Sequence, residues 1–228
     1  MAELGRIKFN NQGQHGRPYE KLPLVVGQYE DENGVVDESA DVNEKLAEIV
    51  SKQLEESGGI KLNLYCRLNP IKGYINIDVT RAADVVFVCG NLQFLTDSTV
   101  DEIRAINAMQ HFYHDDNRIV LTEWRRVLKP SGMLHIEMPD IREMAKRIAV
   151  ATDFELFDAH PPLMWGVDGS QVDWDAIGDT NRNGLTKTRL IQWLETTGYA
   201  NIEEVETVTE PKFCPFALKA YKRVIVTE

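Results

Sequence analysis

The chain has 228 residues, of which 43% are hydrophobic and 27% are charged, a composition typical of globular proteins that excludes fibrous and largely disordered chains. Its net charge of −11 and isoelectric point near 5.0 argue against a phosphate backbone, and so against nucleic acid, as a partner. No stretch approaches the roughly 20 consecutive apolar residues of a membrane helix, so we expect no membrane contact.

The three cysteines, Cys66, Cys89 and Cys214, are odd in number, widely spaced and free of any CxxC pair. This pattern favours reduced thiols over a disulfide framework or a zinc site. It therefore predicts a cytoplasmic protein without a bound metal.

Residues 1–42 are polar and rich in Gly, Asn, Gln and Asp. The sequence Asp31-Glu32-Asn33-Gly34 is typical of a turn and lies between two runs that contain valine, 22–26 and 35–36. We expect an N-terminal polar arm or hairpin over residues 1–42 and one folded domain over residues 43–228. The arm is a candidate contact for a second copy of the chain or for another partner.

A first helix is predicted over residues 43–56, with Asn43 as its N-cap and Gly58-Gly59 as its end. From residue 61 onward, short apolar strands alternate with helical stretches, a pattern typical of a mainly parallel sheet with helices on both faces. The expected strands cover residues 61–66, 74–79, 85–89, 100–107 and 133–138.

A helix is also expected over residues 117–128, with Trp124 or Val127 turned inward and Arg125-Arg126 in solvent. The sequence Lys129-Pro130-Ser131-Gly132 predicts a turn that ends it. Further helices are expected over residues 141–150 and 186–197, and two last strands, 202–207 and 217–226, are expected to form an antiparallel pair at the edge of the sheet.

The stretch from residue 151 to residue 183 has no clear periodicity, and long irregular segments often cover binding sites. It contains Trp165 and Trp174 close to Asp168, Asp173 and Asp175. Aromatic faces beside carboxylates suit a sugar, but the same tryptophans can instead pack this segment onto the body of the domain.

Asp78 lies at the end of the second strand of the expected parallel sheet. A carboxylate at the carboxyl end of such a strand can accept hydrogen bonds from both hydroxyls of a ribose. Taken alone, Asp78 is equally compatible with a solvated residue at a strand end.

Several segments read together resemble a known family. They are Leu62-Asn63-Leu64-Tyr65-Cys66-Arg67, Gly73 to Asp78, Glu123 to Gly132 and His135 to Asp140. Over residues 60–199 the chain resembles the small class I S-adenosylmethionine-dependent methyltransferases. The resemblance implies a Rossmann-like α/β fold with a seven-stranded, mainly parallel sheet, helices on both faces and an antiparallel last strand.

The resemblance also implies S-adenosylmethionine as the cofactor and a small molecule as the methyl acceptor. The residues that it places at the cofactor are Asn63, Tyr65, Cys66, Asp78, Gly90, Asn91, Leu92 and Asn107. His111 is the candidate catalytic residue, since it follows the fourth strand and can remove a proton from a hydroxyl nucleophile. An oxygen of a small polar acceptor, such as a sugar, is the expected target. His111 and His114 can instead be partly exposed histidines without a role in catalysis.

The expected cofactor loop departs from the family pattern. Where the family usually has Leu-Asn-Leu-Gly-Cys-Gly, Tyr65 and Arg67 replace the two glycines. Their side chains are expected to fill the methionine end of the pocket or to strain the backbone. Two accounts follow: an active methyltransferase with an unusual pocket, or a catalytically inactive methyltransferase-like protein that binds a partner. A nicotinamide-dependent dehydrogenase is disfavoured because no GxGxxG follows the first strand.

Overall fold

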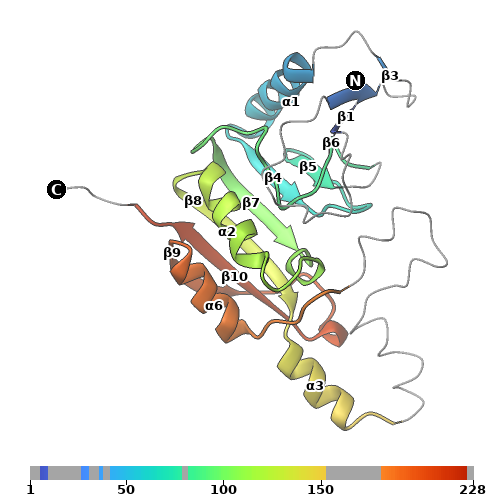
Figure 1. Cartoon of the computed structure of the whole chain (residues 1–228), viewed down its shortest axis with the longest axis vertical. Coiled ribbons are helices and arrows are strands. Elements are labelled where there is room, and N and C mark those ends of the chain that lie inside the picture. The colour runs from blue at the N-terminus through green and yellow to red at the C-terminus, as the bar shows by residue number, and fades with distance from the viewer. Residues whose placement is uncertain are drawn as a thin grey trace.

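The computed structural model describes residues 6–9, 27–30, 36–37, 42–78, 82–152 and 181–224. Its strands form one ten-stranded sheet in the order β3-β2-β1-β6-β5-β4-β7-β8-β10-β9 (Figure 1). The last seven of these strands are those of the expected domain, and the first three precede it in the chain.

The seven-stranded part of the sheet has the predicted topology. Five of its strands are mutually parallel, namely β4 (Lys61–Leu64), β5 (Ile75–Asp78), β6 (Val85–Val86), β7 (Val100–Ile106) and β8 (Leu128–Pro139). The last strand, β10 (Pro215–Lys222), is antiparallel to both β8 and β9 (Tyr199–Val205). Counted from β4 along the chain, the strand order is 3-2-1-4-5-7-6, so the Rossmann-like fold with a reversed last strand is confirmed.

The N-terminal region adds three short strands to this sheet. β1 (Arg6–Phe9) pairs parallel with β6 and antiparallel with β2 (Gly27–Glu30), which pairs antiparallel with β3 (Val36–Asp37). The expected turn at residues 31–34 lies outside the described residues, between β2 and β3. The arm thus contacts the domain through backbone pairing, and the boundary at residue 42 stays a prediction.

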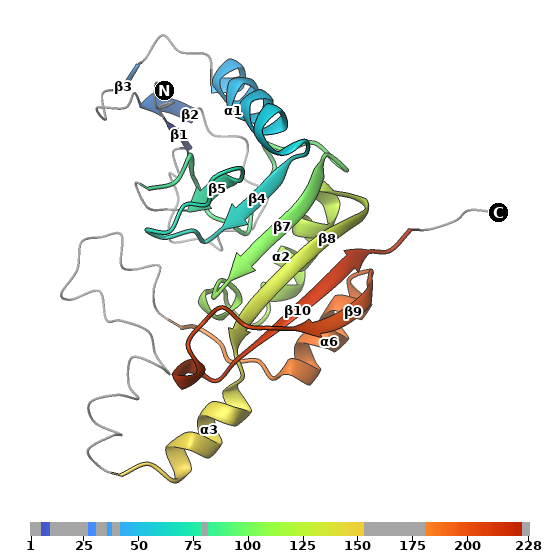
Figure 2. The same ribbon diagram turned by 180° about the vertical axis from the view of Figure 1, so that it is seen from behind.

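Helices form where the apolar spacing predicted them: α1 (Val42–Ser57), α2 (Asn117–Val127), α3 (Ile141–Ala149) and α6 (Lys187–Thr196). Two are capped by side chains, since Asp140 accepts the N–H of Arg142 and Thr186 accepts the N–H of Arg189. Helices α2 and α6 lie on the same face of the sheet, as Figures 1 and 2 show from the two sides. No helix in the described part of the chain is long and apolar enough to cross a membrane.

The prediction of a turn at residues 129–132 is wrong, because these residues belong to strand β8. Val100 of β7 faces Leu128, but Glu102 already faces Met133, so the extra residues of β8 form a bulge in a continuous strand. Ser131 takes the left-handed conformation with φ 62°, and not Gly132. A Cβ at Gly132 would lie 2.9 Å from the carbonyl oxygen of Lys129, which explains the glycine at that position.

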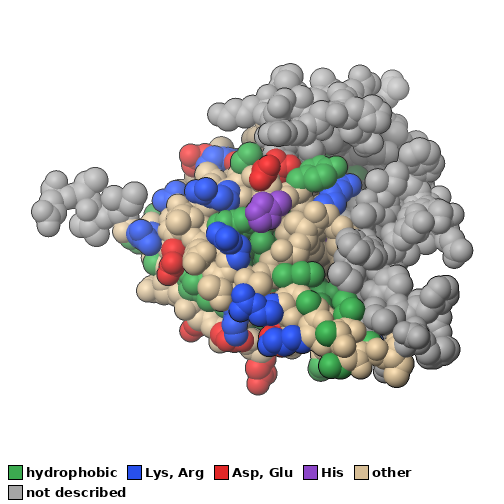
Figure 3. All heavy atoms as spheres, turned by 60° about the horizontal axis from the view of Figure 1, so that its bottom comes forward, with side chains coloured by type: hydrophobic (Ala, Val, Ile, Leu, Met, Phe, Trp, Pro, Cys, Tyr) green, Lys and Arg blue, Asp and Glu red, His purple; other side chains and the backbone are tan. Residues whose placement is uncertain are grey.

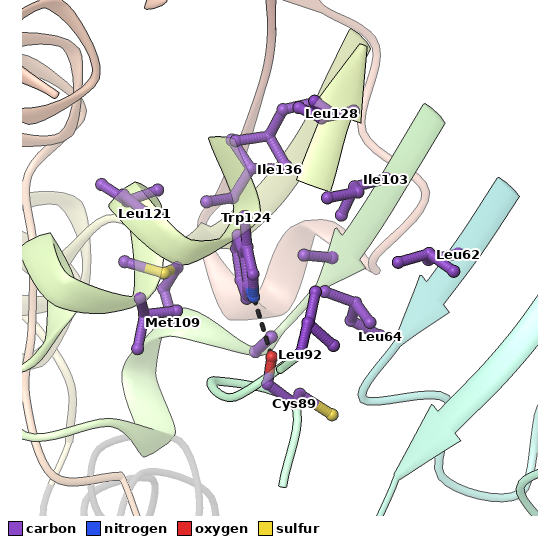
Figure 4. Close-up of a cluster of buried hydrophobic side chains, with 14 of the residues drawn as sticks. Leu62, Leu64, Cys89, Leu92, Ile103, Met109, Leu121, Trp124, Leu128 and Ile136 are labelled. Atoms are coloured by element: carbon purple, nitrogen blue, oxygen red, sulfur yellow. Dashed lines mark hydrogen bonds between the residues drawn. The ribbon is translucent and has the colours of Figure 1, made fainter. Parts of the chain in front are cut away.

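The core between α2 and the sheet is centred on Trp124 (Figure 4). Trp124 and Val127 are both fully buried, so both point inward. The indole N–H of Trp124 donates a 2.8 Å hydrogen bond to the carbonyl oxygen of Cys89, in the segment that follows β6. The core therefore fixes α2 to the carboxyl end of the third strand of the domain.

We predict that Trp124→Phe lowers the free energy of unfolding by about 1–3 kcal/mol, because the buried carbonyl of Cys89 loses its donor. Trp193→Phe is the matched control, since Trp193 is 8% exposed and its indole N–H donates to no other described residue. Denaturant unfolding measures both. Equal losses in the two variants would show that the hydrogen bond contributes nothing.

Candidate active site

The loop after β4 is fixed to the two neighbouring strands through its backbone. The N–H of Tyr65 donates both to the carbonyl oxygen of Ile77 (2.9 Å) and to Sγ of Cys89 (3.0 Å). The N–H of Arg67 donates to Oδ2 of Asp78 at 2.8 Å. The loop therefore lies at the carboxyl ends of β4, β5 and β6, where open α/β sheets bind ligands.

Tyr65 and Arg67, which we expected from the resemblance to replace two glycines, both take left-handed backbone conformations. Their φ values are 60° and 51°. This conformation costs a residue with a Cβ roughly 1–2 kcal/mol, and glycine adopts it without that cost. The expected backbone strain is therefore present at both positions.

The ring of Tyr65 is stacked on the ring of His111. The centroids are 4.4 Å apart and the planes differ by 20°. His111 belongs to the short 3-10 helix η1 (Met109–His111), just after β7, and is 8% exposed. Because β4 and β7 are neighbouring parallel strands, the stack joins their two carboxyl ends.

Asp78 is 1% exposed, and one of its oxygens binds the loop. A carboxylate can accept further hydrogen bonds, so its chemistry fits ribose hydroxyls. At this burial, a ribose reaches it only if the loop after β4 shifts.

Asn63 and Cys66 support this loop in the structure. The amide of Asn63 donates to Oδ1 of Asn76 (2.9 Å), which also accepts the N–H of Ile71 (2.8 Å). Cys66 is buried, and this burial, followed by the charge of Asp78, raises the pKa of its thiol to about 12. Cys66 therefore stays protonated at neutral pH and is a poor nucleophile.

The segment after β6 contains Gly90, Asn91 and Leu92. Oδ1 of Asn91, expected at the adenine, accepts the N–H of Gln93 at 3.1 Å. The side chain of Leu92 is fully buried in the core. Arg126, expected in solvent, instead donates to the carbonyl oxygen of Leu92 at 3.0 Å. The prediction for Arg126 is thus wrong, since this side chain holds the segment in place.

Asn107 directly follows β7 and takes a left-handed conformation with φ 53°. Its amide donates to Oγ1 of Thr209 (3.0 Å), and its N–H donates to the carbonyl oxygen of Glu137 (2.8 Å). The buried carboxylate of Glu137 accepts the N–H groups of Val208 and Thr209. The end of β7 is therefore tied to the connection between β9 and β10.

The turn that carries His111 is clamped by residues 182 and 183, which the sequence had placed in an irregular segment. The side-chain amide of Asn183 donates to the carbonyl oxygens of Met109 (2.8 Å) and Phe112 (2.7 Å). The N–H groups of Arg182 and Asn183 donate to the carbonyl oxygen of Gln110, and Arg182 also donates to that of His111. The only sequence signal for this clamp is the polar Asn181-Arg182-Asn183 run just before the α6 cap.

The structure thus brings Tyr65, Asp78 and His111 together at one edge of the sheet. The roles that we predicted for these and the other cofactor residues stay predictions. Trp165, Trp174 and the nearby aspartates lie outside the described residues. Within the described ranges, no group of three or more His, Cys, Asp and Glu side chains is arranged to hold a metal ion.

The family model of a methyltransferase domain matches residues 39–136, which run from α1 to β8. This part of the chain is therefore similar to methyltransferase domains. Neither the match nor the fold determines the methyl acceptor.

Solved structures share this fold. A methyltransferase from Thermotoga maritima has a TM-score of 0.51 and 14% identity, with 80% of this chain and 92% of that chain covered. One from Methanosarcina mazei has a TM-score of 0.50 and 19% identity, with 78% and 98% covered. No curated protein matches the sequence.

We predict that Arg67→Gly is more stable than Arg67→Ala by about 1 kcal/mol, because only glycine relieves the left-handed strain at this position. Both variants remove the same exposed side chain, so their difference isolates the backbone term. Urea unfolding of the two proteins measures it. An alanine variant as stable as the glycine variant would show that the loop carries no strain at residue 67.

Proposed function

We propose that the protein transfers a methyl group from S-adenosylmethionine to an oxygen of a small polar acceptor, such as a sugar, with His111 as the proton acceptor. The observation that supports this most is the stack of His111 on Tyr65, at the adjacent carboxyl ends of β7 and β4. It puts an imidazole, which can accept a proton, beside the loop that the family uses for its cofactor.

The residues at the sheet edge fit the groups of the cofactor. Asp78 offers a carboxylate to the ribose hydroxyls, and Asn107 has a buried Oδ1 without a hydrogen-bond partner among the described residues. When bound, S-adenosylmethionine supplies a methyl group on a positively charged sulfur. The aromatic face of Tyr65 is a favourable neighbour for such a cation.

The role of His111 is to take the proton that the acceptor hydroxyl loses. The acceptor oxygen forms the new C–O bond as the C–S bond breaks, and the electron pair of that bond stays on sulfur. The hydroxyl proton passes to a ring nitrogen of His111. The protein otherwise aligns the two reactants, which is the main requirement of a direct displacement.

A second candidate function is non-catalytic binding by a methyltransferase-like domain. It is favoured by the burial of Asp78, whose Oδ2 is already bound by the N–H of Arg67. A protein that does not bind the cofactor can keep Asp78 buried and bound to the N–H of Arg67. Cofactor binding separates the two candidates.

We predict that S-adenosylmethionine and S-adenosylhomocysteine bind with measurable heat in calorimetric titration. Asp78→Asn should weaken binding by about 10-fold or more, because hydroxyl groups lose a charged acceptor while Arg67 keeps a neutral one. Asp115→Ala, an exposed carboxylate just after η1, is the control and should leave the affinity unchanged. Absence of heat from the native protein at millimolar ligand would favour the non-catalytic candidate.

We predict that His111→Ala lowers turnover by roughly 10²–10⁴-fold on a panel of sugars and small hydroxy compounds, the range typical of a lost general base. His114→Ala is the matched control, because His114 is exposed and packs edge-on against Trp193, away from Tyr65. Unchanged turnover in His111→Ala removes this residue from the mechanism. Methylation of nitrogen compounds alone would overturn the oxygen acceptor.

A further inference from the structure

Positive charge gathers beside His111, although the chain as a whole has a net charge of −11. Figure 3 is turned toward the carboxyl edge of the sheet and shows Lys and Arg side chains spread across that face. The two described segments that meet at His111, residues 109–119 and 181–190, contain four Lys or Arg residues and two Asp residues. Of the two Asp residues, only Asp115 is exposed. The surface beside the candidate base is therefore opposite in charge to the chain as a whole.

One of these cations, Arg182, is held directly on the turn that carries His111. Its backbone N–H donates to the carbonyl oxygen of Gln110 at 2.7 Å, and its Nη1 donates to the carbonyl oxygen of His111 at 3.2 Å. Its guanidinium lies over the ring of Tyr113, 5.1 Å from the centroid. These three contacts fix the guanidinium, so little side-chain entropy is left to lose when it binds a ligand.

The guanidinium of Arg182 keeps most of its donors available. Arg182 is exposed, and among the residues that the structure describes it has no carboxylate partner and donates from its side chain only through Nη1. A guanidinium has five N–H groups, and the edge formed by Nε and Nη2 matches the two oxygens of a carboxylate. In Arg182 this edge binds no described residue.

The same edge of another arginine binds a carboxylate within this molecule. Nε and Nη2 of Arg126 donate to the two oxygens of Glu123, both at 2.8 Å. Such a bidentate pair is stronger and more specific than a single neutral hydrogen bond. Arg182 presents the equivalent pair of donors to solvent beside the candidate active site.

We propose that Arg182 binds a carboxylate of the methyl acceptor, so that the acceptor is a hydroxy acid, such as a sugar acid. A carboxylate matches the single charge of the guanidinium, whereas a phosphate monoester carries nearly two negative charges, which the acidic chain disfavours. Because Nη1 lies 3.2 Å from the carbonyl oxygen of His111, one small molecule can reach both Arg182 and the candidate base. This inference deepens the proposed function and rests on it for the reaction, but carboxylate binding is independent of turnover.

The test compares three hydroxy acids, glucuronate, lactate and 3-hydroxybenzoate, with their neutral amides, which have nearly the same size and shape. Dissociation constants are measured by ligand-observed NMR at low ionic strength, with and without S-adenosylhomocysteine. For at least one pair, we expect the acid to bind the native protein about 10-fold more tightly than its amide, because only the acid forms charge-assisted hydrogen bonds with a guanidinium.

Arg182→Gln should remove this preference, and Arg182→Lys should keep part of it, because lysine retains the charge but not the paired donors. Arg223→Gln is the matched control and should bind acid and amide as the native protein does. Arg223 is also exposed and also donates at 3.2 Å to a backbone carbonyl, that of Tyr199, but it follows the end of β10 at the opposite edge of the sheet. Circular dichroism confirms that the variants are folded.

The outcomes separate this inference from the proposed reaction. Acid binding that depends on Arg182, in a protein that binds no S-adenosylhomocysteine, would support the carboxylate site and contradict methyl transfer. Methyl transfer to acids and amides at equal rates would support the reaction and overturn the carboxylate site. No preference for any of the three acids in the native protein, or the same preference in the native protein and Arg182→Gln, also overturns it.

Discussion

The candidate site depends on one constraint, the anchoring of the loop after β4 by the N–H groups of Tyr65 and Arg67. These groups bind the carbonyl of Ile77, the thiol of Cys89 and the carboxylate of Asp78, which all lie on or directly after the next two strands. A loop held at these points has a fixed path across the sheet edge. It is this path that brings the ring of Tyr65 onto His111.

The same contacts explain how two bulky residues persist in a glycine conformation. Left-handed backbone at Tyr65 and Arg67 costs about 2–4 kcal/mol together. The three hydrogen bonds to their N–H groups contribute about 1 kcal/mol each, and the Tyr65–His111 stack contributes about 0.5–1.5 kcal/mol. Strain and stabilisation are therefore of similar size. Asp78 is central to this balance, because the carboxylate expected to bind a ribose also holds the loop.

The sequence predicted the parts of the fold that depend on local pattern. Apolar alternation and helical spacing located the strands from β4 to β10 and the four α-helices described, and the reversed last strand followed from the resemblance carried by the segment around Lys129-Pro130-Ser131-Gly132. The same segment gave a wrong prediction at the start of β8. Its proline and glycine suggested a turn, but the left-handed conformation of Ser131 allows a bulge in a continuous strand.

Contacts between distant residues were beyond such reasoning. Asn183 clamps a turn more than 70 residues away, and Arg126 binds the carbonyl of Leu92, 34 residues before it. Neither hydrogen bond corresponds to a local pattern in the sequence from which it could be predicted. For the site, sequence placed Tyr65, Asp78 and His111 at the correct edge, but it did not indicate the stacking of two of them or the burial of the third.

The most direct test of this account is a crystal structure of the protein with S-adenosylhomocysteine. The account predicts ligand density over the carboxyl ends of β4, β5 and β6, with the ribose on Asp78, the loop after β4 shifted from its present path, and His111 bordering the sulfur. Density at any other place on the molecule, or an empty sheet edge with Arg67 still bound to Asp78 at saturating ligand, would contradict it.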